Sequence, residues 1–198
     1  MDDKLNKIKY DKMLLELKYL EADIEYTKQV IAKNTRPFER CTRGTARDQG
    51  VWQEIEERRI KAFSKGPPPQ QKKKKKRIRK KDKELFKKIA KEAHPDKLIH
   101  LSEEERDRKQ EKFLKASTAL QGGSPEEIRQ IAKDLGIDPG PVSEEDMESV
   151  EEKIEEMNKI MSTLKESVIW VWSQKEDKEE KQQIIEMYVR FLLTTLPQ

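Results

Sequence analysis

The sequence predicts an all-α protein, built from amphipathic helices that are joined by polar, flexible stretches. Only 33% of its 198 residues are hydrophobic and 41% are charged, so one large core is not expected. Along several segments, apolar residues recur at spacings of three and four, the period of a helix with one buried face. Repeated capping signals in the C-terminal half mark helix starts.

The N-terminal region, residues 1–63, is predicted to contain two helices. The first spans residues 4–33, and Asn34 to Pro37 should end it, because proline lacks an amide hydrogen and clashes with the preceding turn. A second, shorter apolar face lies within 51–63. An isolated helix of about three heptads is marginal in water, so we expect the first to pack on another helix or on a second copy of the chain. Its apolar positions are Tyr10, Met13, Leu17, Leu20, Ile24 and Ile31.

Residues 64–81 predict a disordered basic linker. The formal net charge of +4 hides a strong segregation of charge, because a nearly pure basic run follows the prolines at 67–69. Clustered cations bind phosphate backbones, so the run is a candidate for weak nucleic-acid binding, although it has no aromatic residue that could stack on bases. The alternative is a solvated linker. The candidate polyanion-binding residues are Lys72, Lys73, Lys74, Lys75, Lys76, Arg77 and Arg79.

The C-terminal half is predicted to be a helical array, with a helical hairpin over 82–121 and a further helical domain over 122–198. A long helix should begin near Ser143 and carry an apolar seam to Val168, and another helix should cover 174–195. Trp170 and Trp172 at the corner between them are expected to be core residues. Helix starts are marked by a serine with an acidic residue three positions later: Ser102 with Glu105, Ser124 with Glu127, Ser143 with Asp146, and Ser173 with Glu176. Gly122, Gly123 and Gly136 lie where helices should end.

The most informative stretch surrounds the tripeptide His94-Pro95-Asp96. Residues 82–97 form an apolar-periodic helix that ends at this tripeptide, because Pro95 biases the residue before it out of the helical region. Residues 102–120 begin with a capping box and carry Phe113 on the following helix. Together these segments resemble the second and third helices of a J domain. The matching core positions are Phe86, Ile89, Ala90, Phe113, Ala116, Ala119 and Leu120.

The sequence departs from the J-domain pattern at two places. Ala93 stands where the family usually has an aromatic residue before the histidine, and the Pro- and Lys-rich run at 66–80 occupies the place of the first helix. Either the helix at 51–63 returns across the linker, or helices after residue 124 cover the exposed side of the hairpin. We expect the second arrangement, since the C-terminal array is close in sequence and apolar enough.

The resemblance implies a co-chaperone that docks on a DnaK-type chaperone and stimulates its ATP hydrolysis. Asp96 would engage a basic and polar network on the chaperone, while His94 and Pro95 hold the turn in position. The flanking helices would select a client protein, which the sequence does not identify. The layout after the hairpin also resembles J-domain-like proteins of tailed bacteriophages and large DNA viruses. The lysines that would approach an acidic patch on the chaperone are Lys83, Lys87, Lys88 and Lys91.

The chain is not expected to be an enzyme or to hold a cofactor. Cys41 is the only cysteine, so no disulfide can form within the chain. His94, Asp96 and His100 do not predict a metal site, because Pro95 breaks the helix that would bring them onto one face. No segment approaches the roughly 20 apolar residues that span a bilayer, so we expect no membrane association and a cytoplasmic location, in the host if the protein is viral. The main alternative is a helical structural or nucleic-acid-associated protein that uses the basic linker.

Overall fold

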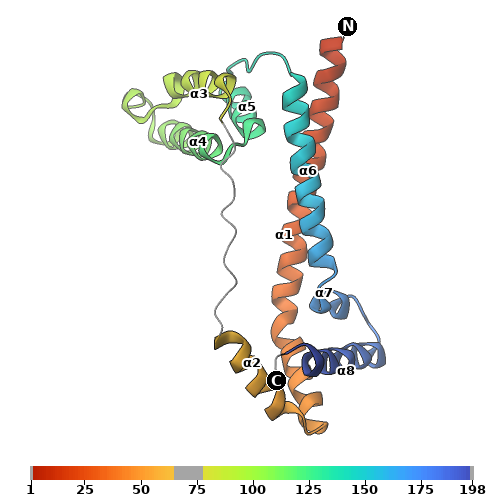
Figure 1. Ribbon diagram of the computed structural model, residues 1–198. Coiled ribbons are helices and arrows are strands. Elements are labelled where there is room, and N and C mark those ends of the chain that lie inside the picture. The colour runs from red at the N-terminus through yellow and green to blue at the C-terminus, as the bar shows by residue number, and fades with distance from the viewer. Residues whose placement is uncertain (1, 65–77, 197–198) are drawn as a thin grey trace. The chain divides into compact units, whose positions relative to one another are not determined.

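The computed structural model describes residues 2–64 and 78–196, and most of the predicted linker lies outside these ranges. Every regular element in the described ranges is a helix, which confirms the all-α prediction (Figure 1). The described residues of 1–17 and 72–154 form one compact unit, and those of 18–71 and 155–198 form a second. Within the described ranges, none of the helices combines the length and the apolar character that a bilayer span requires.

The first unit is centred on three helices, α3 (Lys80–Ala93), α4 (Glu103–Gly122) and α5 (Pro125–Asp134). α3 and α4 pack as a helical hairpin, and α5 lies against both of them. The hairpin is therefore covered by a helix that follows residue 124, as predicted. One cluster of buried side chains joins the three helices: Leu85, Ile89, Ala116, Ala119, Ile128, Ile131 and Ala132.

The second unit contains α2 (Trp52–Ser64), α7 (Val168–Ser173) and α8 (Lys178–Thr195), and α2 and α7 both pack on α8. Trp172 is buried in its core, which confirms its predicted core role, whereas Trp170 is half-buried. The predicted helix over 51–63 is confirmed as α2, and it belongs to this unit rather than to the hairpin. The buried core consists of Phe38, Ala46, Ile55, Trp172, Ile185, Val189 and Leu192.

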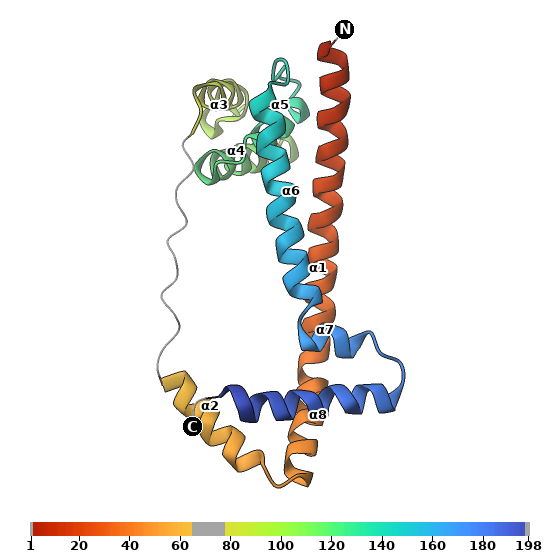
Figure 2. The same cartoon turned by 45° about the vertical axis from the view of Figure 1, so that its right-hand side comes forward.

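Two long helices, α1 (Asp2–Asp48) and α6 (Glu144–Lys165), contribute to both units and lie side by side in Figures 1 and 2. In the first unit, Lys9 Nζ of α1 lies 3.4 Å from Glu151 Oε1 of α6. In the second, the Thr27 hydroxyl donates to the Met161 sulfur at 3.7 Å. The predicted apolar face of the N-terminal helix is thus covered by another helix of the same chain. We call this face the buried seam: Tyr10, Met13, Leu17, Ile24 and Thr27.

The prediction that the first helix ends at Asn34 to Pro37 is wrong, because α1 continues through Pro37 to Asp48. An internal proline costs a helix about 3 kcal/mol. The residues beyond it offset this cost, since the ring of Phe38 packs edge-on against Trp172 at a centroid distance of 5.6 Å. Burial of such a side chain contributes about 1.5–3 kcal/mol, and the buried Ala46 adds further contact.

Local capping signals were correct at some helix starts and wrong at others. Ser102 accepts a hydrogen bond from the Glu105 amide at 3.4 Å, as predicted. The predicted box of Ser173 with Glu176 is wrong, because the Ser173 hydroxyl bonds back to the Trp170 carbonyl at 2.7 Å. Asp177 caps α8 instead, and its carboxylate accepts the amides of the residues two and three positions later, both at 3.3 Å. Ser124 precedes α5 without a side-chain cap.

Replacing Pro37 with alanine tests the continuous course of α1. We expect Pro37→Ala to raise the free energy of unfolding by about 1–3 kcal/mol, because alanine restores an amide that can bond to the Lys33 carbonyl. Equilibrium urea unfolding followed by circular dichroism measures the change. As a control, Pro139→Ala in the loop before α6 removes a proline outside any helix, and it should lower stability slightly through the unfolded chain. A loss of stability in Pro37→Ala would contradict the continuous helix.

Candidate functional site

The end of α3 is set by the proline that follows His94. His94 adopts an extended backbone with φ −67° and ψ 133°, and its amide still donates to the Ala90 carbonyl at 3.1 Å. Pro95 opens a short 3-10 helix, η1 (Pro95–Lys97). Leu98 follows it and is almost fully buried, so the turn is anchored to the unit directly after the tripeptide. The chain then enters α4 through the Ser102 cap.

Within this turn, His94 is held in place and Asp96 is presented to solvent. The Asp96 amide donates to Nδ1 of His94 at 3.4 Å, which fixes the orientation of the imidazole. The imidazole also lies edge-on against the Phe113 ring of α4, with centroids 5.3 Å apart. The side chain of Asp96 is 85% exposed, compared with 44% for His94. The turn therefore offers a carboxylate at its tip and keeps the histidine against the hairpin.

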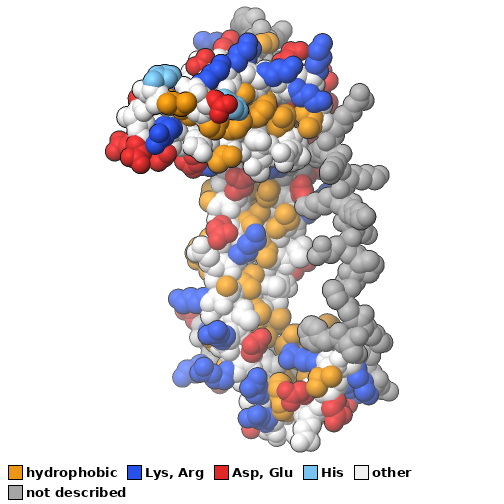
Figure 3. Space-filling view, turned by 90° about the vertical axis from the view of Figure 1, so that its left-hand side faces the viewer, with side chains coloured by type: hydrophobic (Ala, Val, Ile, Leu, Met, Phe, Trp, Pro, Cys, Tyr) orange, Lys and Arg blue, Asp and Glu red, His pale blue; other side chains and the backbone are white. Residues whose placement is uncertain are grey.

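A basic face runs along α3 beside this turn. Its lysines lie opposite the positions that α3 buries, because Leu85 and Ile89 occupy the other side of the helix. Figure 3, whose upper part shows the α3–α5 body, has Lys and Arg side chains gathered along the edge of that body. The face can attract an acidic surface, although each exposed contact contributes at most about 1 kcal/mol. We call it the lysine face: Lys83, Lys87, Lys88 and Lys91, all exposed.

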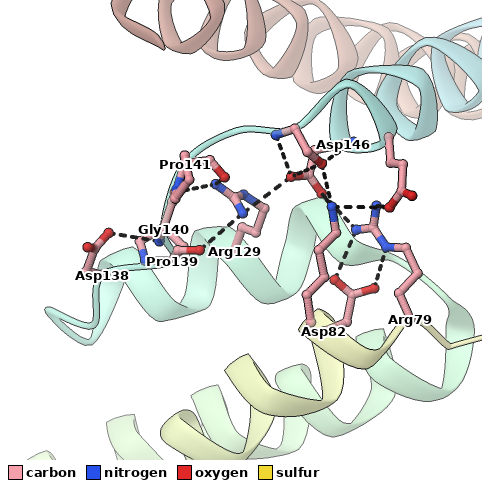
Figure 4. A network of polar contacts seen from close by, with 11 residues as sticks. Arg79, Asp82, Arg129, Asp138, Pro139, Gly140, Pro141 and Asp146 are labelled. Carbon is pink, nitrogen blue, oxygen red and sulfur yellow. Dashed lines mark hydrogen bonds and ion pairs between the residues drawn. The ribbon is translucent and has the colours of Figure 1, made fainter.

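The base of the hairpin is held by a buried polar cluster around Asp146, the third residue of α6 (Figure 4). Arg79, directly before α3, lies 2.8 Å from the Asp146 carboxylate and also forms a bidentate pair with Asp82 at 2.7 and 3.0 Å. Lys81 of α3 approaches the same Asp146 oxygen at 3.0 Å. Ser143 donates to Asp146 through its amide and its hydroxyl, both at 3.0 Å. These contacts fix the start of α3 against the start of α6.

Arg129 brings α5 into the same cluster. Its guanidinium lies 3.5 Å from Asp146 and donates to three consecutive carbonyls of the loop before α6, those of Pro139, Gly140 and Pro141, at 2.8–3.2 Å (Figure 4). The side chains of Arg129 and Asp146 are only 6% and 1% exposed. A buried pair of this kind stabilises a fold only when its remaining polar atoms are also bonded, as most of them are here.

The electrostatic state of Asp146 follows from these contacts. Burial alone would raise the pKa of its carboxyl. Hydrogen bonds from Ser143 and Lys81, together with the charge of Arg129, outweigh burial and hold this pKa below its usual value. Asp146 is therefore ionised at neutral pH and supplies a shared counter-charge to the three cations around it.

The predicted site residues fall into three groups. The His94-Pro95-Asp96 turn and the lysine face lie on the same hairpin, on neighbouring segments. The predicted polyanion-binding residues from Lys72 to Arg77 lie outside the described residues. Arg79, which was predicted to bind polyanions as part of the linker, has its guanidinium engaged with Asp82 and Asp146. Within the described ranges, no group of His, Cys, Asp and Glu side chains is placed to hold a metal ion.

Sequence reasoning did not find the roles of Arg129 and Asp146. Asp146 had a local signal, since it stands three residues after Ser143 in the capping-box pattern, and it does bond back to the Ser143 amide. Arg129 had no such signal, because its partners lie in the loop before α6 and in α6 itself. α5 carries several charged residues of both signs, so its composition does not single out Arg129 as a buried charge.

Neutralising Asp146 should destabilise the first unit. We expect Asp146→Asn to cost about 3–5 kcal/mol, because Arg129 would stay buried without its counter-charge. Glu145→Gln is the matched control, since the adjacent Glu145 contacts the same Arg79 and Lys81 with a side chain that is 70% exposed. Its loss should stay below about 1 kcal/mol. Urea unfolding of both variants at neutral pH measures the difference, and equal losses would contradict the buried role of Asp146.

The same comparison has a predicted pH dependence. Because the folded-state pKa of Asp146 is lowered, its contribution is complete above the unfolded value of about 3.9 and is lost as the pH falls through the folded value. The stability gap between the wild-type protein and Asp146→Asn should therefore narrow below about pH 4. A gap that stays constant down to pH 2 would show that the charge of Asp146 is not what stabilises the unit.

The first unit thus combines an exposed carboxylate, a positioned histidine and a basic helix face on one hairpin. Comparison with family models, curated proteins and solved structures found no match to this chain. What the hairpin can do is inferred from its own geometry and from the spacing of its motifs.

Proposed function

We propose that this protein is a J-domain-like co-chaperone, which docks on a DnaK-type chaperone and stimulates its ATP hydrolysis. The observation that carries the proposal is the His94-Pro95-Asp96 turn, which presents an 85% exposed aspartate at the tip of a helical hairpin. A short acidic side chain at a fixed tip can enter a basic and polar pocket of a larger protein. The resemblance of residues 82–120 to a J domain indicates that this larger protein is a DnaK-type chaperone.

The lysine face would provide the first contact. Its exposed cations act over about one Debye length, roughly 8–10 Å at physiological salt, and favour approach to an acidic patch. Such contacts are individually weak, so the complex would form and dissociate rapidly. Rapid dissociation suits a protein that acts on another protein's ATPase cycle and is not consumed by it.

The first unit also supplies a substitute for the first helix of a J domain, which the Pro- and Lys-rich sequence before the hairpin does not predict. α5 buries Ile128 and Ile131 against the hairpin, and the Asp146 cluster fixes the start of α3. A hairpin supported in this way can hold its turn in one conformation. We infer that the helices outside the hairpin select the client, and that the protein acts in the cytoplasm, in the host cell if it is viral.

A single-turnover ATPase assay tests the proposal. The wild-type chain should accelerate ATP hydrolysis by a DnaK-type chaperone, and Asp96→Asn should reduce this stimulation by at least about tenfold, or about 1.4 kcal/mol of activation free energy. The physical reason is that the variant keeps the shape of the turn but loses the charge at its tip. The stimulation by the wild-type chain should also fall as salt is raised, because salt screens the lysine face.

Asp107→Asn is the matched control, since Asp107 is another exposed aspartate of the hairpin, on α4 and not in the turn itself. It should stimulate as well as the wild-type chain. If the wild-type chain stimulates neither bacterial nor eukaryotic chaperones, the proposal fails. Salt-dependent binding to DNA or RNA that is lost when Lys72 to Lys76 are neutralised would then favour the nucleic-acid-associated alternative.

A further inference from the structure

α1 carries a second line of apolar side chains, which α6 does not cover. Its large members are 59–70% exposed: Leu5, Ile8, Leu15, Tyr19 and Tyr26. With the exposed Lys12 and Ala22, they occupy every position of an alternating three- and four-residue repeat from 5 to 26. This is the repeat of a coiled-coil interface. We call these residues the exposed seam.

The exposed seam lies on nearly the opposite side of α1 from the buried seam. The two repeats are offset by two residues, which corresponds to about 200° around a helix. All of these residues lie on one uninterrupted helix, so helix geometry alone fixes their relative positions. Since α6 already holds α1 in its helical form, a further partner would not have to order this segment on binding.

We propose that a second copy of this chain packs on the exposed seam in antiparallel orientation. This inference is independent of the co-chaperone proposal. The repeat has two kinds of seam position, one followed by a three-residue step and one followed by a four-residue step. In an antiparallel coiled coil, a residue at the first kind of position faces a residue at the second kind on the partner helix. The best register places Leu5 opposite Ala22 and Ile8 opposite Tyr19 of the second copy. Lys12 lies opposite Leu15, so the centre is less apolar than the ends and the dimer should be weak.

The charges beside the exposed seam select this partner and this orientation. In the antiparallel register, residues that flank the seam on the same side meet across the interface. Lys4 then faces Glu25, Asp11 faces Lys18, and Lys9 faces Glu16 of the second copy. Asp11 and Lys9 also form ion pairs within their own chain, with Lys133 at 3.2 Å and Glu151 at 3.4 Å, so the pairing of Lys4 with Glu25 is the main selective one. Each pairing joins opposite charges, and each occurs twice because the dimer is symmetric. The basic start of α1 thus complements its own acidic middle.

A parallel pair would place like charges together. In a parallel coiled coil, a flanking residue faces the residue five positions further along the second helix. Lys4 would then meet Lys9, and Asp11 would meet Glu16. Only Lys18 with Asp23 would be attractive. Two of the three pairings are repulsive in this orientation, whereas the three antiparallel pairings named above are attractive.

Sedimentation equilibrium of the full chain over a concentration series tests the dimer. The wild-type chain should associate to a dimer, and Ile8→Asp should raise the dissociation constant at least about tenfold, because it buries a carboxylate at a seam position. Ile60→Asp is the matched control, since Ile60 is a 66% exposed isoleucine on α2, outside the exposed seam. It should dimerise like the wild-type chain. Circular dichroism should show the same helix content in all three proteins.

A charge exchange tests the orientation. Lys4→Glu and Glu25→Lys should each weaken the dimer about tenfold, because each turns two attractive contacts into two repulsive ones. The double variant, Lys4→Glu with Glu25→Lys, restores opposite charges and should recover wild-type association. In a parallel dimer, Lys4→Glu would instead strengthen association by pairing with Lys9. A strengthened Lys4→Glu dimer overturns the proposal, as does a wild-type chain that remains monomeric up to about 1 mM.

Discussion

The structure of the first unit depends on the neutralisation of one buried carboxylate. Asp146 is approached by Arg79 before α3, Lys81 in α3 and Arg129 in α5, so a single charge joins three segments of the chain. Replacing such a cluster with apolar side chains is often neutral for stability, but removing one member leaves an uncompensated charge. We infer that its main effect is structural specificity. It defines where α3 starts, and this in turn sets the position of the turn at the other end of the helix.

The hairpin itself could be predicted from the sequence because its signals act over short distances. Pro95 ends α3 by constraining the residue before it, and the Ser102 capping box begins α4 a few residues later. Of the predicted core positions of α3, Ile89 is buried and Phe86 packs partly buried against the same cluster, whereas the buried Leu85 was not predicted. The exposure of Asp96 follows from these features, because a turn between two helices that pack together has only its tip left for solvent.

Features that depend on distant residues could not be predicted. Arg79 and Asp146 are separated by 67 positions, and the basic composition around Arg79 suggested a solvated linker instead. The course of α1 through Pro37 is a second example, since the local signal for a helix end was strong. It was overridden by the contact of Phe38 with Trp172, 134 residues further along the chain, which no local pattern reveals. Propensity yields to tertiary packing wherever burial exceeds the local cost.

α1 also shows why an apolar repeat does not identify its own partner. The buried and exposed seams have the same spacing, and a helix cannot turn two opposite faces to one neighbour. Tyr10, Met13 and Leu17 are buried and leave Leu5, Ile8 and Tyr19 uncovered on the other side. The apolar residues of the exposed seam alone would allow a second helix to pack in either the parallel or the antiparallel direction. Orientation must come from the flanking charges, because Lys4 and Lys9 meet acidic residues only when the second copy runs antiparallel, whereas Lys18 meets one in either orientation.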